Sequence, residues 1–197
     1  MQFIVGVTGA SGMIYTKILL EELLKKGSVH LIITKSGIKV LKEELNISLR
    51  DVYEKDKKII NRLFGSKVFY YDVEDITAPI SSGTYKVDGM VIVPCSMATV
   101  SAIANGSSKN LLERAADVTL KEKRKLIIVP RETPLNVIHL RNLLTLSEAG
   151  VSVVPAMPAF YFKPNSLEDL IKPFVGRILD QLGIEHNLYT PWGLNPK

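Results

Sequence analysis

Short apolar runs alternate with amphipathic segments along most of the chain. The apolar runs have the length and composition of strands buried on both faces of a sheet, and we expect them at residues 3–7, 29–34, 68–71, 88–94, 126–129 and 151–154. The intervening segments repeat apolar positions at helical spacing and predict helices at residues 13–26, 36–45, 49–64, 109–123, 137–149 and 167–182. A further helix is expected to start after residues 95–99 and to break at residues 105–106. Alternating strands and helices predict an α/β fold with a three-layer parallel sheet, Rossmann-like or flavodoxin-like.

The length limits the domain organisation. A chain of 197 residues suffices for one well-buried α/β domain and is short for two. We therefore expect one domain over residues 1–182 and an irregular tail, residues 183–197, that docks on a neighbouring subunit. No apolar run approaches the roughly 20 residues of a membrane helix. Hydrophobic residues make up 46% of the chain, and we expect the surplus to lie at a subunit interface.

The charged residues do not indicate a nucleic-acid binder. The net charge is +5, but the basic side chains are spread, with dense spots only at residues 55–58 and 121–125 and no interleaved aromatic residues. Such runs are typical of a solvated helix face, or they bind an anionic small molecule. The absence of a signal-like start and the single cysteine, Cys95, predict a cytoplasmic protein without an internal disulfide.

The turn after the first strand has the composition of a phosphate-binding turn. Residues 9–12 read Gly-Ala-Ser-Gly and open the first helix, where small residues admit a ligand and free N–H groups carry partial positive charge. A plain tight turn is the alternative, because short glycine motifs are not specific. The second strand ends in Thr34-Lys35-Ser36 and not in the acidic residue that holds the ribose of NAD, which argues against a dinucleotide.

Later strands also end in loops whose residues are suited to ligand binding or catalysis. Residues 94–99, PCSMAT, offer hydroxyls that either cap a helix or bind a polar ligand group. Residues 130–134, PRETP, place a charged pair between prolines at a strand end, where open α/β sheets bind ligands. Residues 155–164 form an apolar, proline-stiffened loop. A catalytic thiol at Cys95 is conceivable, although no histidine lies nearby in sequence.

Five segments, taken in this order and at these separations, closely resemble the flavin prenyltransferases, the enzymes that make the prenylated FMN used by partner decarboxylases. The segments are residues 8–12, 94–99, 113–122, 130–134 and 158–161, and the resemblance extends from about residue 3 to Trp192. It implies a flavodoxin-like homo-oligomer, commonly a dodecamer. It also implies that reduced FMN and dimethylallyl phosphate bind at subunit interfaces.

The resemblance also assigns residues. The residues expected to bind FMN are Gly9, Ala10, Ser11, Thr34, Ser96, Met97, Ala98, Thr99 and Arg131. Those expected to bind the allylic phosphate are Lys121, Arg131, Tyr161 and Arg177, with Arg114 on the same charged helix as Lys121. Those expected to handle protons or to position the reactants are Ser11, Glu44 and Glu132. The catalytic candidates are therefore Ser11, Glu44, Lys121, Arg131, Glu132, Tyr161 and Arg177.

These residue types suit the implied reaction, which joins a dimethylallyl group to N5 and C6 of the flavin. Lys and Arg donors stabilise the departing phosphate without a metal, and the dispersed His30, His139 and His186 do not suggest a metal site. The positively charged allylic fragment needs a dry, electron-rich pocket, which the loop around Tyr161 and the flavin ring supply. The C6 proton passes to Glu44, Glu132 or the released phosphate, and the sequence does not choose among them.

Two other functions compete with prenyl transfer. FMN-dependent cysteine decarboxylases share the fold family but carry an Asn in the loop matching residues 94–99 and an early catalytic His. Here that loop reads PCSMAT, and the early His30 lies inside a predicted strand. A non-catalytic flavin carrier or accessory subunit of a decarboxylase would not need Lys121, Tyr161 and Arg177. The sequence leaves open the recipient decarboxylase, the exact oligomer and the choice between a monophosphate and a diphosphate donor.

Overall fold

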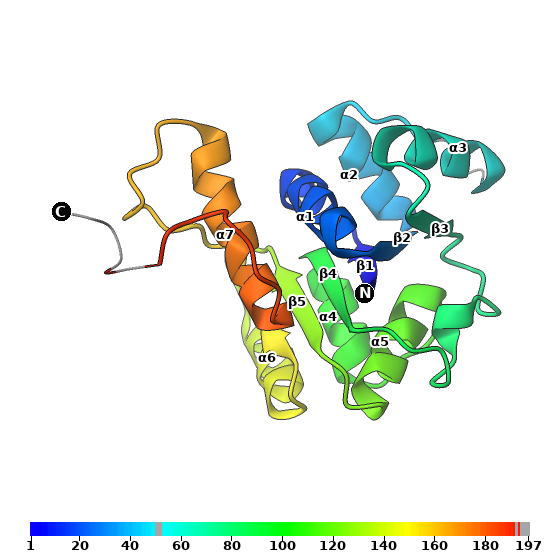
Figure 1. Ribbon diagram of the computed structural model, residues 1–197. Helices are drawn as coiled ribbons and strands as arrows, with labels where there is room; N and C mark the ends of the chain where they lie inside the picture. The colour runs from blue at the N-terminus through cyan, green and yellow to red at the C-terminus, as the bar shows by residue number, and fades with distance from the viewer. Residues whose placement is uncertain (50–52, 192, 194–197) are drawn as a thin grey trace.

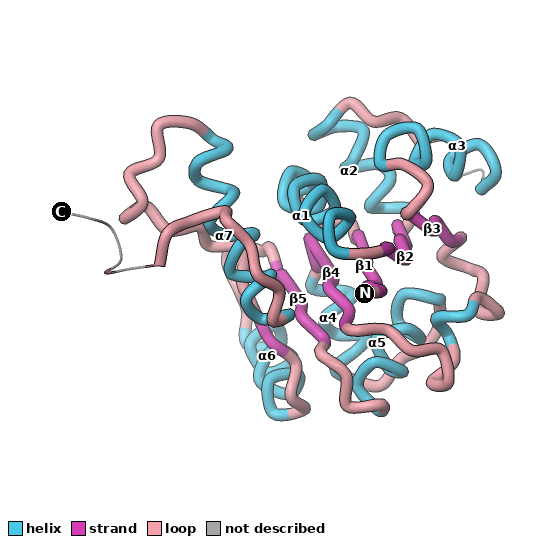
Figure 2. The backbone as a smooth tube through the Cα atoms, in the orientation of Figure 1, coloured by secondary structure: helices cyan, strands magenta, loops and turns pink. Residues whose placement is uncertain are grey.

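The computed structural model describes residues 1–49, 53–191 and 193, and a parallel sheet lies at its centre (Figures 1 and 2). Its strands are β1 (Gln2–Val7), β2 (Ser28–Ile33), β3 (Val68–Tyr71), β4 (Gly89–Cys95), β5 (Leu126–Pro130) and β6 (Ser152–Val153). The strand order is β3-β2-β1-β4-β5-β6, and every neighbouring pair is parallel. This is the doubly wound Rossmann order, so the expected α/β class with a parallel sheet is confirmed.

Helices cover both faces of the sheet. One face carries α1 (Met13–Lys26), α2 (Lys35–Leu45), α3 (Tyr53–Phe64) and α7 (Leu167–Leu182). The other carries α4 (Met97–Ala104), α5 (Leu111–Lys121) and α6 (Val137–Glu148), with a short 3-10 helix at Pro79–Ser81. None of the described helices is both long and apolar enough to cross a membrane.

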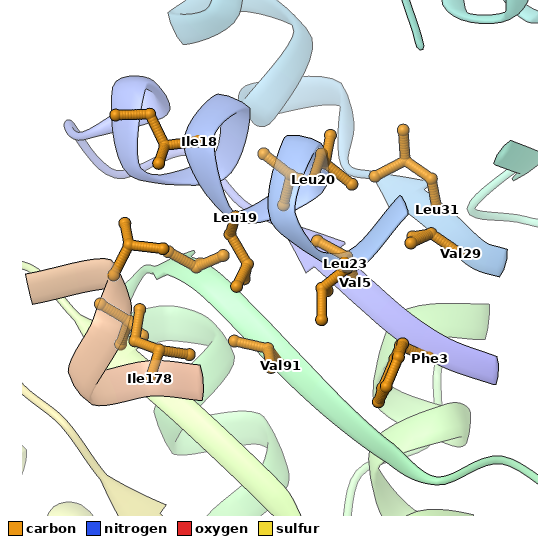
Figure 3. Close-up of a cluster of buried hydrophobic side chains, with 14 of the residues drawn as sticks. Phe3, Val5, Ile18, Leu19, Leu20, Leu23, Val29, Leu31, Val91 and Ile178 are labelled. Atoms are coloured by element: carbon orange, nitrogen blue, oxygen red, sulfur yellow. The ribbon is translucent and has the colours of Figure 1, made fainter. Parts of the chain in front are cut away.

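The alternation of side chains in β1 divides the core into two clusters. Phe3 and Val5 point to the cluster beneath α1 and α7, whereas Ile4 joins the cluster beneath α4 and α5. Figure 3 shows Leu19 and Leu23, four residues apart on α1, above Val5 and Val91. Because both faces of β1 are buried, its sequence is a continuous apolar run.

Most predicted elements are confirmed, and the differences lie at element ends. The helix expected at residues 109–123 begins at Leu111, because the Asn110 side chain caps it by accepting from the backbone N–H of Glu113 at 3.0 Å. The last strand has only two residues, and Pro155, which has no N–H to donate, follows soon after it. The start of the helix expected at residues 49–64 partly lies outside the described residues.

Candidate active site

The loops that follow β1 and β4 meet where the strand order reverses, which is where ligands of doubly wound sheets bind. Thr8 joins the two loops. Its hydroxyl donates to the carbonyl oxygen of Pro94 at 2.8 Å and accepts from the backbone N–H of Ser96 at 2.7 Å. Thr8 is buried, so these two bonds fix the start of the Gly9–Gly12 turn against the start of α4.

A carboxylate of the chain itself binds the backbone N–H groups at the N-terminus of α1. Glu44 accepts hydrogen bonds from the backbone N–H of Gly12 at 2.9 Å and of Met13 at 2.8 Å. Burial raises the pKa of Glu44, but hydrogen bonds from Ser11, Met13 and Gly12, with the charge of Arg131, outweigh this and hold that pKa below its ordinary value. The site therefore contains an ionised carboxylate beside Ser11 and Arg131.

This contact narrows one expectation of the sequence, that the turn binds a phosphate. The turn was predicted to offer its N–H groups to a phosphate, and in this structure Glu44 accepts from those of Gly12 and Met13. The physical reasoning holds, because an anion does sit at this helix start. The anion is a side chain that follows the turn by more than thirty residues, which no local motif indicates.

Two more helices begin at the same edge, and hydroxyls cap both. Thr34 accepts from the backbone N–H of Gly37 at 3.1 Å at the start of α2, and Ser96 accepts from that of Thr99 at 3.4 Å at the start of α4. The capping alternative raised for residues 94–99 is thus realised at Ser96, and Thr34 caps α2 in the same way. A hydroxyl has a second lone pair and a proton, so capping does not exclude a ligand contact.

The remaining members of the predicted FMN set differ in exposure. Ala98 is exposed and Thr99 half-buried, whereas the Met97 side chain is buried in the core beneath α4. Met97 therefore offers a ligand mainly its backbone. A Cβ atom on Gly9 would lie 2.5 Å from the Cβ of Ser36, so only glycine lets the loops after β1 and β2 come this close.

Arg131 and Glu132 line a cavity at the end of β5. The backbone N–H of Arg131 donates to the carbonyl oxygen of Cys95 at 3.3 Å, and that of Ala156 donates to Pro130 at 3.0 Å, which brings the loop after β6 alongside. The cavity has a volume of about 300 Å³ and is lined by Pro130, Arg131, Glu132, Thr133, Leu135, Leu143, Pro155, Ala156 and Met157. Its mixed apolar and charged lining suits a ligand with both characters.

Tyr15 is a neighbour of this site that the sequence did not indicate. Burial raises the pKa of its hydroxyl, while the positive charge of Arg131 opposes that rise, so the two side chains interact. Its ring lies 4.9 Å from that of Phe174 on α7. The only sequence signal is an aromatic residue in the first turn of α1, which is also typical of core packing.

Arg177 and Tyr161 lie on a connected set of contacts. One terminal nitrogen of Arg177, Nη1, donates to Asp180 at 2.8 Å and to the Tyr189 hydroxyl at 3.4 Å. The Tyr189 ring lies 5.6 Å from that of Phe162, which lies 4.3 Å from the Tyr161 ring. Asp180 and Tyr189 were not predicted, although the spacing of three residues between Arg177 and Asp180 is typical of a helical ion pair.

Lys121 and Arg114 lie elsewhere on the same chain. Lys121 ends α5 just before β5 begins, whereas Arg131 follows the far end of β5, about 15 Å along the strand. Lys121 pairs with Glu122 at 2.6 Å, and Arg114 pairs with Asp117 at 2.9 Å. Moreover, α5 and α7 cover opposite faces of the sheet. Lys121 therefore does not meet Arg131 or Arg177 within one chain.

Two further sequence expectations are corrected. Cys95 is fully buried and burial raises the pKa of its thiol, so it is no accessible thiolate. The basic run at residues 121–125 is partly structural, because Arg124 donates to the backbone of Gly83 and Tyr85, and Lys125 donates to Leu182. Within the described part of the chain, no cluster of three or more His, Cys, Asp or Glu could hold a metal ion.

Comparison with known proteins places this chain in a family. The model of the family described as Flavoprotein matches residues 1–178. The flavin prenyltransferase UbiX of Halalkalibacterium halodurans is 55% identical over 97% of this chain and 93% of its own length. That of Methanocaldococcus jannaschii is 50% identical over 98% of this chain and 99% of its own.

Solved structures agree with these relatives. The crystal structure of AnUbiX (PadA1) in complex with FMN and dimethylallyl pyrophosphate has a TM-score of 0.88 and 37% identity, over 98% of this chain and 97% of that one. A dodecameric FMN-dependent UbiX-like decarboxylase from Escherichia coli O157:H7 has a TM-score of 0.87 and 41% identity, over 98% and 99%. A PPC decarboxylase mutant, at 21% identity over 80% and 82% and a TM-score of 0.61, shares the fold alone. The chain therefore belongs to the flavoprotein family and, within it, to the flavin prenyltransferases.

Proposed function

We propose that this chain joins a dimethylallyl group from dimethylallyl phosphate to N5 and C6 of reduced FMN, giving prenylated FMN for a partner decarboxylase. The full-length identity to flavin prenyltransferases supports the reaction class, and the related AnUbiX was solved with FMN and dimethylallyl pyrophosphate. The observation in this chain that best supports the proposal is the set of residues at the sheet edge where α1, α2 and α4 begin. There an ionised Glu44 lies with Ser11 beside Arg131.

The residues at this edge fit FMN. The starts of α2 and α4 provide partial positive charge and the hydroxyls of Thr34, Ser96 and Thr99 for its polar groups. The turn of Gly9, Ala10 and Ser11 lets the backbone approach the ring system, and Arg131 supplies a full charge. When bound, the flavin supplies the nucleophilic N5 and C6 positions.

The phosphate of the donor needs cations, and the acidic residues can receive the proton. Arg131 and Arg177, together with the Tyr161 hydroxyl, would bind the departing phosphate and stabilise its growing charge. Glu44 is ionised at neutral pH and can accept the proton lost from C6. The exposed Glu132 accepts from the backbone N–H of Thr133 at 3.1 Å and is the second acidic candidate.

Lys121 and Arg114 would complete the site from a neighbouring copy of the chain. The outer face of α6 supports assembly, because Val137, Ile138, Leu140 and Leu144 are each more than half exposed in the single chain. We propose a homo-oligomer, a dodecamer as in the E. coli relative, with the tail of residues 183–197 among its contacts. Trp192, the expected contact, lies outside the described residues. A cytoplasmic location also stays a prediction.

The test of this function is direct. Purified protein is mixed with reduced FMN and either dimethylallyl phosphate or the diphosphate, and mass spectrometry follows the gain of one C5 unit by the flavin. Arg177→Ala should abolish turnover and leave FMN bound. Lys172→Ala, which removes a half-buried cation of the same helix paired with Glu168, should retain turnover. Full turnover by Arg177→Ala would contradict the phosphate assignment. Bound FMN with no product from the unmodified protein would favour a flavin carrier.

A further inference from the structure

The chain beyond α7 folds back onto that helix. Figure 1 shows the red segment after α7 running alongside it. Gly176 provides the contact surface, because a Cβ atom there would lie 2.7 Å from the Tyr189 ring and 2.8 Å from the Cε1 atom of His186. The space that a side chain would fill at Gly176 is thus taken by two side chains of the returning segment.

Asp180 is the centre of the polar contacts that hold this segment. One carboxylate oxygen, Oδ2, accepts from Arg177 Nη1 at 2.8 Å and from the Tyr189 hydroxyl, and the other, Oδ1, lies 3.2 Å from His186 Nε2. The backbone N–H of Leu188 donates to His186 Nδ1 at 3.1 Å, which leaves the ring proton on Nε2 to donate to Asp180. Burial raises the pKa of Asp180, but these hydrogen bonds and the charge of Arg177 outweigh it and hold that pKa below its ordinary value.

Tyr189 makes a second set of contacts with its ring. The ring lies 5.6 Å from that of Phe162, which follows Tyr161 in the apolar loop, and 5.1 Å from that of His186. One side chain of the returning segment therefore touches Arg177 through its hydroxyl and the Tyr161 loop through its ring. These are the two elements proposed to bind the allylic phosphate.

The contacts leave part of the guanidinium available. Among the described residues, the hydrogen bonds of Arg177 are all made by Nη1, and its side chain is 57% exposed. A long arginine side chain loses considerable rotamer freedom when it binds an anion, and holding one nitrogen in advance reduces that loss. Nε and Nη2 can then meet a phosphate with their planar fork geometry.

We propose that Tyr189 and Asp180 are positioning residues for prenyl transfer. Both fix Arg177 through Nη1, and the Tyr189 ring also holds the Tyr161 loop through Phe162, so that the segment at residues 184–191 sets both phosphate-binding side chains. The inference rests on the proposed function of Arg177 and Tyr161. It gives the segment a task within its own subunit, separate from any contact with a neighbour.

Tyr189→Phe tests the inference, because it removes the hydroxyl and keeps the ring against Phe162 and Gly176. We expect the KM for dimethylallyl phosphate to rise about tenfold, the effect of losing one hydrogen bond to a charged group, with kcat and FMN affinity within about twofold. The matched control is Tyr71→Phe in β3, the outermost strand on the side of the sheet away from β6. It deletes a hydroxyl that lies 3.0 Å from His30 Nδ1 and should lower thermal stability without changing the KM.

A double-mutant cycle separates positioning from a general structural effect. Calorimetry measures the Kd of dimethylallyl phosphate for the FMN-loaded protein, with Tyr189→Phe made alone and in the Arg177→Ala background. If Tyr189 acts through Arg177, the tenfold loss in affinity disappears in that background. An equal loss in both backgrounds, or an unchanged KM in the single variant, would overturn the inference. Failure of the unmodified protein to bind or turn over the donor would instead overturn the proposed function.

Discussion

Replacement of Glu44 separates the role that the structure shows for this carboxylate from the role that we propose for it. Glu44 holds the start of α1 through the backbone N–H groups of Gly12 and Met13, and it lies ionised beside Arg131, where we propose that it accepts the C6 proton. Glu44→Gln keeps the size and one acceptor oxygen but removes the charge. The variant should therefore weaken the first role and abolish the second.

The structural cost follows from the hydrogen bonds. A hydrogen bond to a charged group contributes about 1.5–3 kcal/mol, and the exposure of Glu44 reduces this, so we expect Glu44→Gln to cost about 1 kcal/mol. For a chain of this length that lowers Tm by roughly 2–4 °C. Because the folded-state pKa lies below the ordinary 4.5, the contribution is present above that value and is lost as the pH falls through the folded pKa. The difference between the two proteins should shrink in acid.

The catalytic cost should be much larger than the structural one. Loss of a general base lowers kcat by about 10²–10⁴-fold, measured as prenylated flavin formed per minute at saturating donor. Glu43→Gln, which removes the neighbouring exposed carboxylate, is the control for net charge and should match the unmodified protein in both assays. A Glu44→Gln variant with lowered Tm but full kcat would limit Glu44 to holding the helix. An unchanged Tm would refute the contact itself.

Three further predictions concern the rest of the molecule. Burial lowers the pKa of His30 to about 4, so between pH 6.5 and 4 the unfolded chain binds a proton that the folded chain excludes. The free energy of unfolding, measured with urea, should therefore fall by up to about 3 kcal/mol over this range. This pH dependence should be absent in His30→Gln. Paired Leu140→Glu and Leu144→Glu should dissociate the assembly in light scattering and abolish turnover. Gly9→Ala should weaken FMN binding at least tenfold in fluorescence titration, because its Cβ would overlap Ser36.

The fold could be predicted because each buried strand and helix has its own local pattern. The helix bounds Met13–Lys26 and Leu167–Leu182 agree with the prediction, since Gly27 and Gly183 end them and apolar residues repeat at helical spacing. The predicted helix starts two residues before α5, because the cap at Asn110 depends on one side-chain hydrogen bond. A capping residue looks like any other polar residue in sequence.

The sequence proposes candidate site residues, but not the contacts that the structure gives them. Loops after parallel strands share one edge, which places Arg131 near Ser96 without further information. Glu44 was assigned through the family resemblance, but its contact with Gly12 depends on how α2 lies against α1. The contact of Tyr189 with Arg177 depends on a chain reversal after α7. The tail has no regular sequence pattern from which this reversal could be predicted.

The proposed assembly would explain three features of the single chain. Phe160 and Tyr161 are 72% and 55% exposed, although a positively charged allylic fragment needs a pocket without water. Lys121 lies at the opposite edge of the sheet from Arg131, and the apolar face of α6 is uncovered. A neighbouring copy that covers α6 would bury the aromatic loop and bring its own Lys121 to the phosphate. Assembly and turnover should therefore be lost together in the α6 variant, and a dissociated protein that still prenylates FMN would show that one chain holds the whole site.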